Sequence, residues 1–322
     1  MHPGNEKQAL LPARAKIITN KRGTAPGFHI NSGNCELFFT PGVPSEMLAM
    51  LEDYILPALQ ERLPNPPLRL QRILNVFGLA EPEVESRILK AGLPEGVELA
   101  FAVEFSVVQV KLRATGPEAG ALIDQAELRV RQTLGDNLFG YGGQTLAEVT
   151  ASLFCVTELS LALAESCTGG LIAKLLTDQP GASAFLERSI VSYANSAKTS
   201  CLDVPAQLLE EHGAVSAECA EAMVTGLAKA AQTDITLAVT GIAGPGGGTA
   251  EKPVGCVYIA MQSDGKLRVE RFLFPGNRAQ VRLRTALTAL DWLRKQANRS
   301  LLEPSFDVSP EGPQEVFQEG KP

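Results

Sequence analysis

The chain has 322 residues and a net charge of −7 at pH 7, and 45% of its residues are apolar and 20% are charged. This length is typical of two or three globular domains. The negative charge and the lack of a Lys/Arg cluster argue against a nucleic-acid partner, because phosphate binding needs a basic surface. The sequence also has no apolar run long enough to span a membrane and no secretion signal at its start, so we expect a cytoplasmic protein without a membrane partner.

Residues 1–67 form the first predicted domain, which is rich in Gly and Pro turns. One helix is predicted from Ser45 to about Leu63, with Ser45 as its N-cap and the prolines of residues 64–67 as its stop. The proline cluster also marks a linker to the next domain.

Residues 68–143 are predicted to form a small α+β domain. Its elements are a strand at Leu68–Phe77, a helix at Glu81–Ala91, strands at Ala100–Val103 and Val107–Arg113, and a helix at Glu118–Leu134. This order resembles a KH-like module, but the basic G-x-x-G loop of RNA-binding versions is not recognisable. We therefore favour a spacer or interface domain over an RNA-binding one.

Residues 144–300 alternate predicted strands and helices, which indicates an α/β layer architecture. The elements are helices at Thr145–Thr157, Leu171–Leu176 and Arg278–Ala297, and strands at Leu159–Ala164, Ile235–Val239, Val254–Met261 and Val269–Phe274. Residues 301–322 form an acidic tail that we expect to be disordered.

The segment Ser166–Gly170 lies where a predicted strand passes into a helix. Open α/β sheets bind ligands at the carboxyl ends of their strands, and a helix start presents free N–H groups to an anion. Such a turn suits a phosphate or the oxyanion of an acyl-transfer reaction. The alternative is structural: Ser166 or Thr168 caps the helix, and the glycines allow close packing.

A serine nucleophile needs a general base, and the histidines of this chain are only His2, His29 and His212. A lysine can take that role when burial lowers its pKa, as in Ser-Lys variants of the catalytic triad. Lys198, in the segment that begins at Ser192, is a candidate base, although most lysines are solvated surface groups. Cys167 is a second possible nucleophile, but no histidine lies near it in sequence to form a thiolate pair.

The segment Thr240–Gly248 is rich in glycine and follows a predicted buried strand. Glycine there suggests close approach of the backbone to a ligand, and a mobile loop is the alternative. The segment is neither a Walker loop nor G-x-G-x-x-G before a helix, so a nucleotide cofactor is not supported. Asn277 is predicted to cap the last helix, and Arg278 either reaches a phosphate or is an ordinary surface arginine. The six cysteines contain no C-x-x-C pair, so no zinc site is expected.

Five motifs of the third domain occur in one order. They are AESCTGG (164–170), TDQPGAS (177–183), VSYANSAK (191–198), GAVS (213–216) and TGIAGPGGG (240–248). The series resembles the carboxy-terminal domain of the CinA family, the competence/damage-inducible proteins, and its stand-alone nicotinamide-nucleotide amidases. The resemblance implies an α/β sandwich domain that hydrolyses nicotinamide mononucleotide to nicotinate mononucleotide and ammonia, with no metal and no cofactor.

The same resemblance implies that Ser166 is the nucleophile and Lys198 its base, and that Tyr193 orients Lys198 or relays a proton. Backbone N–H groups of residues 166–170 would stabilise the oxyanion. The substrate-binding residues would be Thr168, Gly169, Gly170, Asn195, Thr240, Gly241, Ile242, Ala243, Gly244 and Arg278. The expected partner is the small-molecule nucleotide substrate, and we expect a homo-oligomer.

The first domain also resembles CinA, through NKRGTAPG (20–27) and PGVPSEM (41–47). These motifs are similar to the later part of a molybdopterin-binding-like domain that has ADP-ribose pyrophosphatase activity in full-length members. The earlier part, with its GGLGPT-type loop and acidic metal ligands, is missing from this sequence. We therefore expect a partial domain that does not bury its own apolar sheet face. The alternatives to the amidase are an ADP-ribose pyrophosphatase, which the missing part disfavours, and a non-catalytic partner-binding protein.

Overall fold

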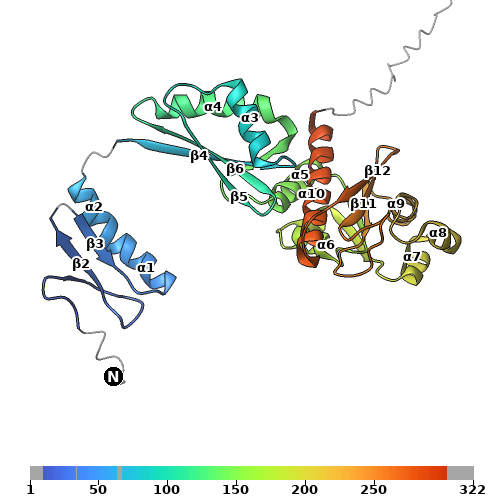
Figure 1. Ribbon diagram of the computed structural model, residues 1–322, viewed down its shortest axis with the longest axis horizontal. Coiled ribbons are helices and arrows are strands. Elements are labelled where there is room, and N and C mark those ends of the chain that lie inside the picture. The colour runs from blue at the N-terminus through green and yellow to red at the C-terminus, as the bar shows by residue number, and fades with distance from the viewer. Residues whose placement is uncertain (1–9, 34, 64–66, 303–322) are drawn as a thin grey trace, which may run out of the picture. The chain divides into compact units, whose positions relative to one another are not determined.

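The computed structural model describes residues 10–33, 35–63 and 67–302. The chain divides into two compact units, Met1–Leu68 and Arg69–Pro322 (Figure 1). The expected disordered tail lies outside the described residues, apart from its first two positions, and so does most of the expected proline stop. None of the described helices is both long and apolar enough to cross a membrane.

The first unit contains a three-stranded antiparallel sheet in the order β1-β2-β3. The strands are β1 (Lys16–Ile18), β2 (Gly27–Ser32) and β3 (Cys35–Phe39), and they precede α1 (Pro44–Met50), a π-helical turn (Leu51–Ile55) and α2 (Leu56–Arg62). The small core consists of Ile18, Met50 and Ile55. Ile17 stays 63% exposed and Phe39 43% exposed, whereas Ile18 is buried against the helices.

The predicted helix of the first unit exists, but its expected cap is wrong. Val43 is the N-cap, and no side chain caps the helix. Pro44 occupies the first helical turn, where its fixed φ suits the helix and its missing N–H costs nothing. Ser45 therefore lies inside the helix rather than before it.

The second unit begins with a four-stranded antiparallel sheet in the order β5-β6-β4-β7. Its elements are β4 (Arg69–Phe77), α3 (Glu81–Ala91), β5 (Glu98–Glu104), β6 (Val107–Thr115), α4 (Ala119–Leu134) and β7 (Leu138–Tyr141). The buried side chains of β6 alternate along the strand and join those of α3 and α4 in one core. The predicted α+β arrangement is confirmed, with β7 as an unpredicted edge strand.

A five-stranded mixed sheet follows, in the order β12-β11-β10-β8-β9. Its elements are α5 (Leu146–Thr157), β8 (Leu161–Glu165), α6 (Leu171–Thr177), β9 (Leu186–Val191), α7 (Asn195–Leu202), α8 (Ala206–His212), α9 (Ala217–Ala231), β10 (Ile235–Gly241), β11 (Cys256–Ser263), β12 (Lys266–Leu273) and α10 (Arg278–Leu302). Strands β9, β8 and β10 run parallel, and β10, β11 and β12 pair antiparallel.

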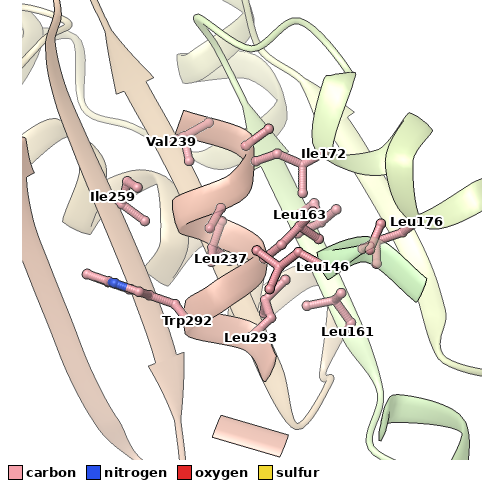
Figure 2. Packing of buried hydrophobic residues seen from close by; sticks show 14 of the residues in the cluster. Leu146, Leu161, Leu163, Ile172, Leu176, Leu237, Val239, Ile259, Trp292 and Leu293 are labelled. Atoms are coloured by element: carbon pink, nitrogen blue, oxygen red, sulfur yellow. The ribbon is translucent and has the colours of Figure 1, made fainter. Parts of the chain in front are cut away.

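Helices cover both faces of this sheet. On β8, Leu161 and Leu163 pack with α5, α6 and α10, whereas Ala162 and Ala164 pack with α9 on the other face. Figure 2 shows Leu163 and Leu237 meeting Leu293 of α10 in the first of these cores. The predicted α/β layers are confirmed. Because β8, β9 and β10 are parallel, the segments that follow them meet at one edge of the sheet.

Candidate active site

Ser166 is the first residue after β8, and its backbone N–H donates to the Val239 carbonyl of the neighbouring strand at 3.0 Å. Its side chain is only 8% exposed. The chain then turns through Gly169 and Gly170, whose φ angles of 59° and 88° lie in the left-handed region. Glycine adopts that region without steric cost, so the two glycines permit the sharp turn into α6.

The capping alternative for Ser166 and Thr168 is wrong. Gly170 is the N-cap of α6, and no side chain caps it from that position. The Glu165 carboxylate instead accepts hydrogen bonds from the N–H groups of Ile172, at 3.2 Å, and Ala173, at 2.8 Å. This buried carboxylate satisfies the helix start and leaves the Ser166 hydroxyl free for chemistry.

Lys198 lies on α7 and is 1% exposed, so the alternative of a solvated surface lysine is also wrong. Its Nζ is 3.0 Å from the Ser166 Oγ and donates to the carbonyls of Ser192, at 2.8 Å, and Tyr193, at 3.3 Å. No carboxylate of the described residues forms an ion pair with it. Burial lowers the pKa of Lys198 below its ordinary value, because the charged amine loses its hydration.

The same contacts allow a neutral amine to act as a base. The two N–H bonds of a neutral Lys198 can serve the Ser192 and Tyr193 carbonyls, and the lone pair then faces the Ser166 hydroxyl. The structure thus brings together the two predicted side chains, which lie on different elements.

The Cys167 thiol is buried beside this pair. Burial raises its pKa to about 12, so it is protonated at neutral pH and a poor nucleophile. Of the two side chains, Ser166 is the better candidate nucleophile.

Two of the turn amides that were expected to hold an oxyanion are already used. The N–H of Ser166 donates to Val239, and the N–H of Gly169 donates to the Ser166 carbonyl at 3.1 Å. Within residues 67–302, the N–H groups of Cys167, Thr168 and Gly170 donate to no backbone carbonyl, and the first two are hydrogen-bonded to the Cys167 sulfur. These three amides are the candidate oxyanion donors of the turn, and the amide directly after the serine is the usual donor in serine hydrolases with a strand-to-helix turn.

Arg282 of α10 contacts this turn, and this contact was not predicted from the sequence. Its Nε and Nη2 both donate to the Thr168 carbonyl, at 3.2 Å and 2.6 Å. Two hydrogen bonds from one guanidinium to the same carbonyl fix the orientation of the peptide group between Thr168 and Gly169. The residue escaped prediction because it lies within a long helix, with no local motif of its own.

The glycine-rich segment after β10 is shaped largely by internal contacts. A Cβ on Gly241 would lie 2.7 Å from a methyl group of Val257, and one on Gly244, at φ 82°, would lie 2.6 Å from Val254. The Thr240 hydroxyl donates to the Ala214 carbonyl at 2.6 Å. Close packing on β11 and on the loop before it therefore explains part of the glycine content that suggested ligand contact.

Tyr193 and Arg278 meet at the outer rim of the site. Arg278, the first residue of α10, donates from Nη2 to the Tyr193 hydroxyl at 2.7 Å and from Nη1 to the Gly244 carbonyl at 2.9 Å. Tyr193 is 58% exposed and contacts Lys198 through its carbonyl rather than its phenol. The Asn277 side chain accepts from the Gln280 N–H at 3.1 Å, as expected of a helix cap.

A cavity of about 180 Å³ opens beside Ser166. The residues that line it are Ser166, Cys167, Tyr193, Lys198, Ala214, Val215, Thr240, Gly241, Ala243 and Arg278. The other expected binding residues, Thr168, Gly169, Gly170, Asn195, Ile242 and Gly244, do not line it. Ala214 and Val215 were missed as lining residues, although they lie in the GAVS motif before the Ser216 cap of α9. Within the described ranges, no three His, Cys, Asp or Glu side chains are placed to hold a metal ion.

Comparison with known proteins gives the family. Residues 143–297 match the CinA C-terminal domain, and residues 71–140 match the KH domain of the damage-inducible protein CinA. The crystal structure of the competence/damage inducible protein CihA from Agrobacterium tumefaciens is 41% identical, with a TM-score of 0.46, and covers 48% of this chain and 93% of that one.

Relatives extend the match over most of the chain. A CinA-like protein of Syntrophotalea carbinolica is 54% identical over 295 residues, which cover 92% of this chain and 72% of the relative. A CinA-like protein of Geobacter sulfurreducens is 47% identical over 302 residues, which cover 92% of this chain and 73% of the relative. The chain belongs to the CinA family.

Proposed function

We propose that this chain is a serine-dependent amidase that hydrolyses nicotinamide mononucleotide to nicotinate mononucleotide and ammonia. The observation that carries the proposal is the 3.0 Å contact between the buried Lys198 amine and the Ser166 hydroxyl. A lysine whose pKa is lowered by burial, next to a serine and a turn with backbone amides, supplies the groups that acyl transfer requires.

The reaction has two halves. Lys198 takes the Ser166 proton as Oγ attacks the carboxamide carbon, and the turn amides of Cys167, Thr168 and Gly170 stabilise the oxyanion. Lys198 then gives its proton to the leaving nitrogen, and ammonia departs, which leaves nicotinate mononucleotide bound to Ser166 as an ester through its carboxyl group. Water attacks that ester with Lys198 again as the base, which releases the carboxylate and restores Ser166. No step calls for a metal or a redox cofactor.

The size of the cavity supports an end-on mode of binding. Whole ligands of drug size occupy pockets of about 300–1,000 Å³, and this cavity holds only about 180 Å³. The pyridine ring and its carboxamide fit inside, and the ribose phosphate stays at the rim. Arg278 is exposed there and is the cation suited to the phosphate.

The test is ammonia release from nicotinamide mononucleotide by the full chain. We expect Ser166→Ala and Lys198→Ala to lose about 100- to 10,000-fold in rate, the range typical of a lost general base or more. Ser196→Ala, at an exposed position of the same helix, serves as the matched control and should retain full activity. Equal ammonia release by wild type and both active-site variants would refute the amidase.

A further inference from the structure

A second cavity, of about 680 Å³, lies within the second unit and shares no lining residue with the cavity at Ser166. Its walls come from α10 and β12 on one side and from the end of β4 and the β5–β6 hairpin on the other. Its size falls in the range of sites that hold small organic ligands. We call it the hairpin cleft.

Aromatic side chains dominate the hairpin cleft. They are Phe77, Phe105, Phe272, Phe274 and Trp292. The rings of Phe272 and Phe274 stack with centroids 5.3 Å apart, and Phe272 meets Trp292 edge-on at 5.9 Å. This wall is already ordered by its own contacts and by the Arg268 guanidinium, which lies 3.8 Å from the centre of the Trp292 ring on one of its faces.

Arg284 is the cation of the hairpin cleft. Its Nη1 donates to the Ser106 hydroxyl at 2.8 Å, and its guanidinium lies 4.6 Å from the centre of the Phe105 ring. Among the described residues, no carboxylate pairs with Arg284 and no acceptor is recorded for its Nη2. A half-buried guanidinium with donors to spare is suited to a carboxylate or a phosphate.

The acidic side chains of the hairpin cleft do not neutralise Arg284. Asp291 is paired with Arg294 at 2.7 Å and with Lys295 at 2.8 Å. Glu81 is exposed and lies in the first turn of α3, where the helix dipole favours it. Arg284 is therefore the half-buried unpaired charge of the cleft, and Glu81 is an exposed carboxylate on its lining.

We propose that the hairpin cleft is a ligand site of its own, for a flat aromatic or heteroaromatic ring that carries a carboxylate or a phosphate. The ring packs against Phe272 and Trp292, and the anionic group pairs with Arg284. The ligand needs both its ring and its anionic group, because packing of the ring buries apolar surface and the ion pair with Arg284 selects a charged ligand over a neutral one. This site does not depend on the amidase activity.

Trp292 provides a specific signal for occupancy, because it is the single tryptophan of the chain, lines the cleft and is 5% exposed. The experiment titrates the full chain and follows the emission of Trp292. To test a phosphate ligand, AMP is compared with its neutral counterpart adenosine. To test a carboxylate ligand, benzoate is compared with its neutral counterpart benzyl alcohol. Inorganic phosphate tests the anion without a ring.

We expect at least one of the two anions to change the emission saturably below about 1 mM, and at least tenfold more tightly than its neutral counterpart. Arg284→Gln should weaken that binding about tenfold or more, whereas Arg284→Lys, which keeps the charge, should retain part of it. Thr288→Phe, which fills the hairpin cleft and leaves Arg284 in place, should also abolish the change. Arg299→Gln, exposed in the last turn of α10, is the matched control and should bind like wild type.

Three results would overturn the proposal. The first is no emission change with either anion at 1 mM. The second is equal binding of an anion and its neutral counterpart. The third is a change that persists in both Arg284→Gln and Thr288→Phe, since the ligand would then be bound elsewhere.

Discussion

The Nζ of Lys198 lies 3.0 Å from the Oγ of Ser166, although the two residues come from different elements that meet at one edge of the sheet. The amine is buried and has no carboxylate partner among the described residues, and burial lowers its pKa, which favours the neutral form that can accept a proton.

The pH dependence of the reaction should report Lys198. Only the neutral amine is a base, so kcat/KM for nicotinamide mononucleotide should rise with pH through an apparent pKa below the ordinary value of 10.5. Steady-state rates between pH 6 and 10 measure this rise of kcat/KM with pH. A flat profile in that range, or a rise at an unshifted lysine pKa, would contradict the role of Lys198.

Burial of Lys198 also links stability to pH. Its pKa is lower in the folded chain than in the unfolded chain, so the unfolded state binds more protons and wild-type stability should rise as the pH approaches 10.5. The variant Lys198→Met has no titratable group at this position, so its stability lacks this dependence on pH. The free energy of unfolding of the variant minus that of wild type should therefore decrease as the pH rises. The total decrease is about 1.4 kcal/mol for each unit by which the fold lowers the pKa of Lys198. Urea unfolding at pH 6, 8 and 10 checks the trend, and a difference that does not vary with pH would oppose it.

Arg282 should act as a positioning residue. Its two bonds to the Thr168 carbonyl orient the turn that carries the candidate oxyanion donors, and a small misplacement of such groups costs up to about 100-fold in rate. Arg282→Gln should therefore lower kcat and leave KM and the pH dependence unchanged. Arg299→Gln on the same helix is the control. A change confined to KM would indicate substrate contact instead.

Arg278 should affect binding rather than chemistry. It lies at the rim of the cavity, joined to the Tyr193 hydroxyl, and does not contact Lys198. Arg278→Gln should raise KM for nicotinamide mononucleotide about tenfold while kcat stays within a fewfold of wild type, as expected for a lost charge-assisted hydrogen bond. Nicotinamide riboside, which lacks the phosphate, should show no such effect. An equal rise in KM for both substrates would argue against phosphate binding by Arg278.

Gly226 should be essential to the packing behind the active site. A Cβ there would lie 1.8 Å from the Leu202 carbonyl at the end of α7, the helix that carries Lys198. Gly226→Ala should destabilise the chain by about 1–3 kcal/mol, the usual cost of overpacking. Gly120→Ala, whose added Cβ would meet only Leu70 at 3.9 Å, should instead stabilise by about 0.5–1 kcal/mol. Thermal or urea unfolding of the two variants separates these outcomes.

The sequence predicted several of the long elements well, but not the 15-residue helix α9. The helix at Glu81–Ala91 agrees with α3 at both ends, and the layered α/β arrangement of residues 144–300 is confirmed. The edge strand β7 was missed because its four residues, which include Gly140, carry too little alternation to stand out. The three strands of the first unit were also missed.

The site was predictable only in part. The order of the motifs pointed to Ser166 and Lys198, whereas the residues alone could not exclude a cap for the first or a solvated side chain for the second. Burial of Lys198 depends on packing between α7 and α9, which no local pattern encodes. Glu165 and Arg282 were missed because their roles depend on contacts with the turn backbone rather than on a motif.

The proposed mechanism requires an ester between Ser166 and the carboxyl group of nicotinate mononucleotide. The direct measurement is peptide mass mapping of wild type quenched in acid within the first turnovers on nicotinamide mononucleotide. We expect the mass of the nicotinate mononucleotide acyl group, ribose phosphate included, on the peptide that contains Ser166, and none on that peptide in Ser166→Ala. Turnover without an ester, or an ester on Cys167, would contradict the assignment of Ser166 as the nucleophile.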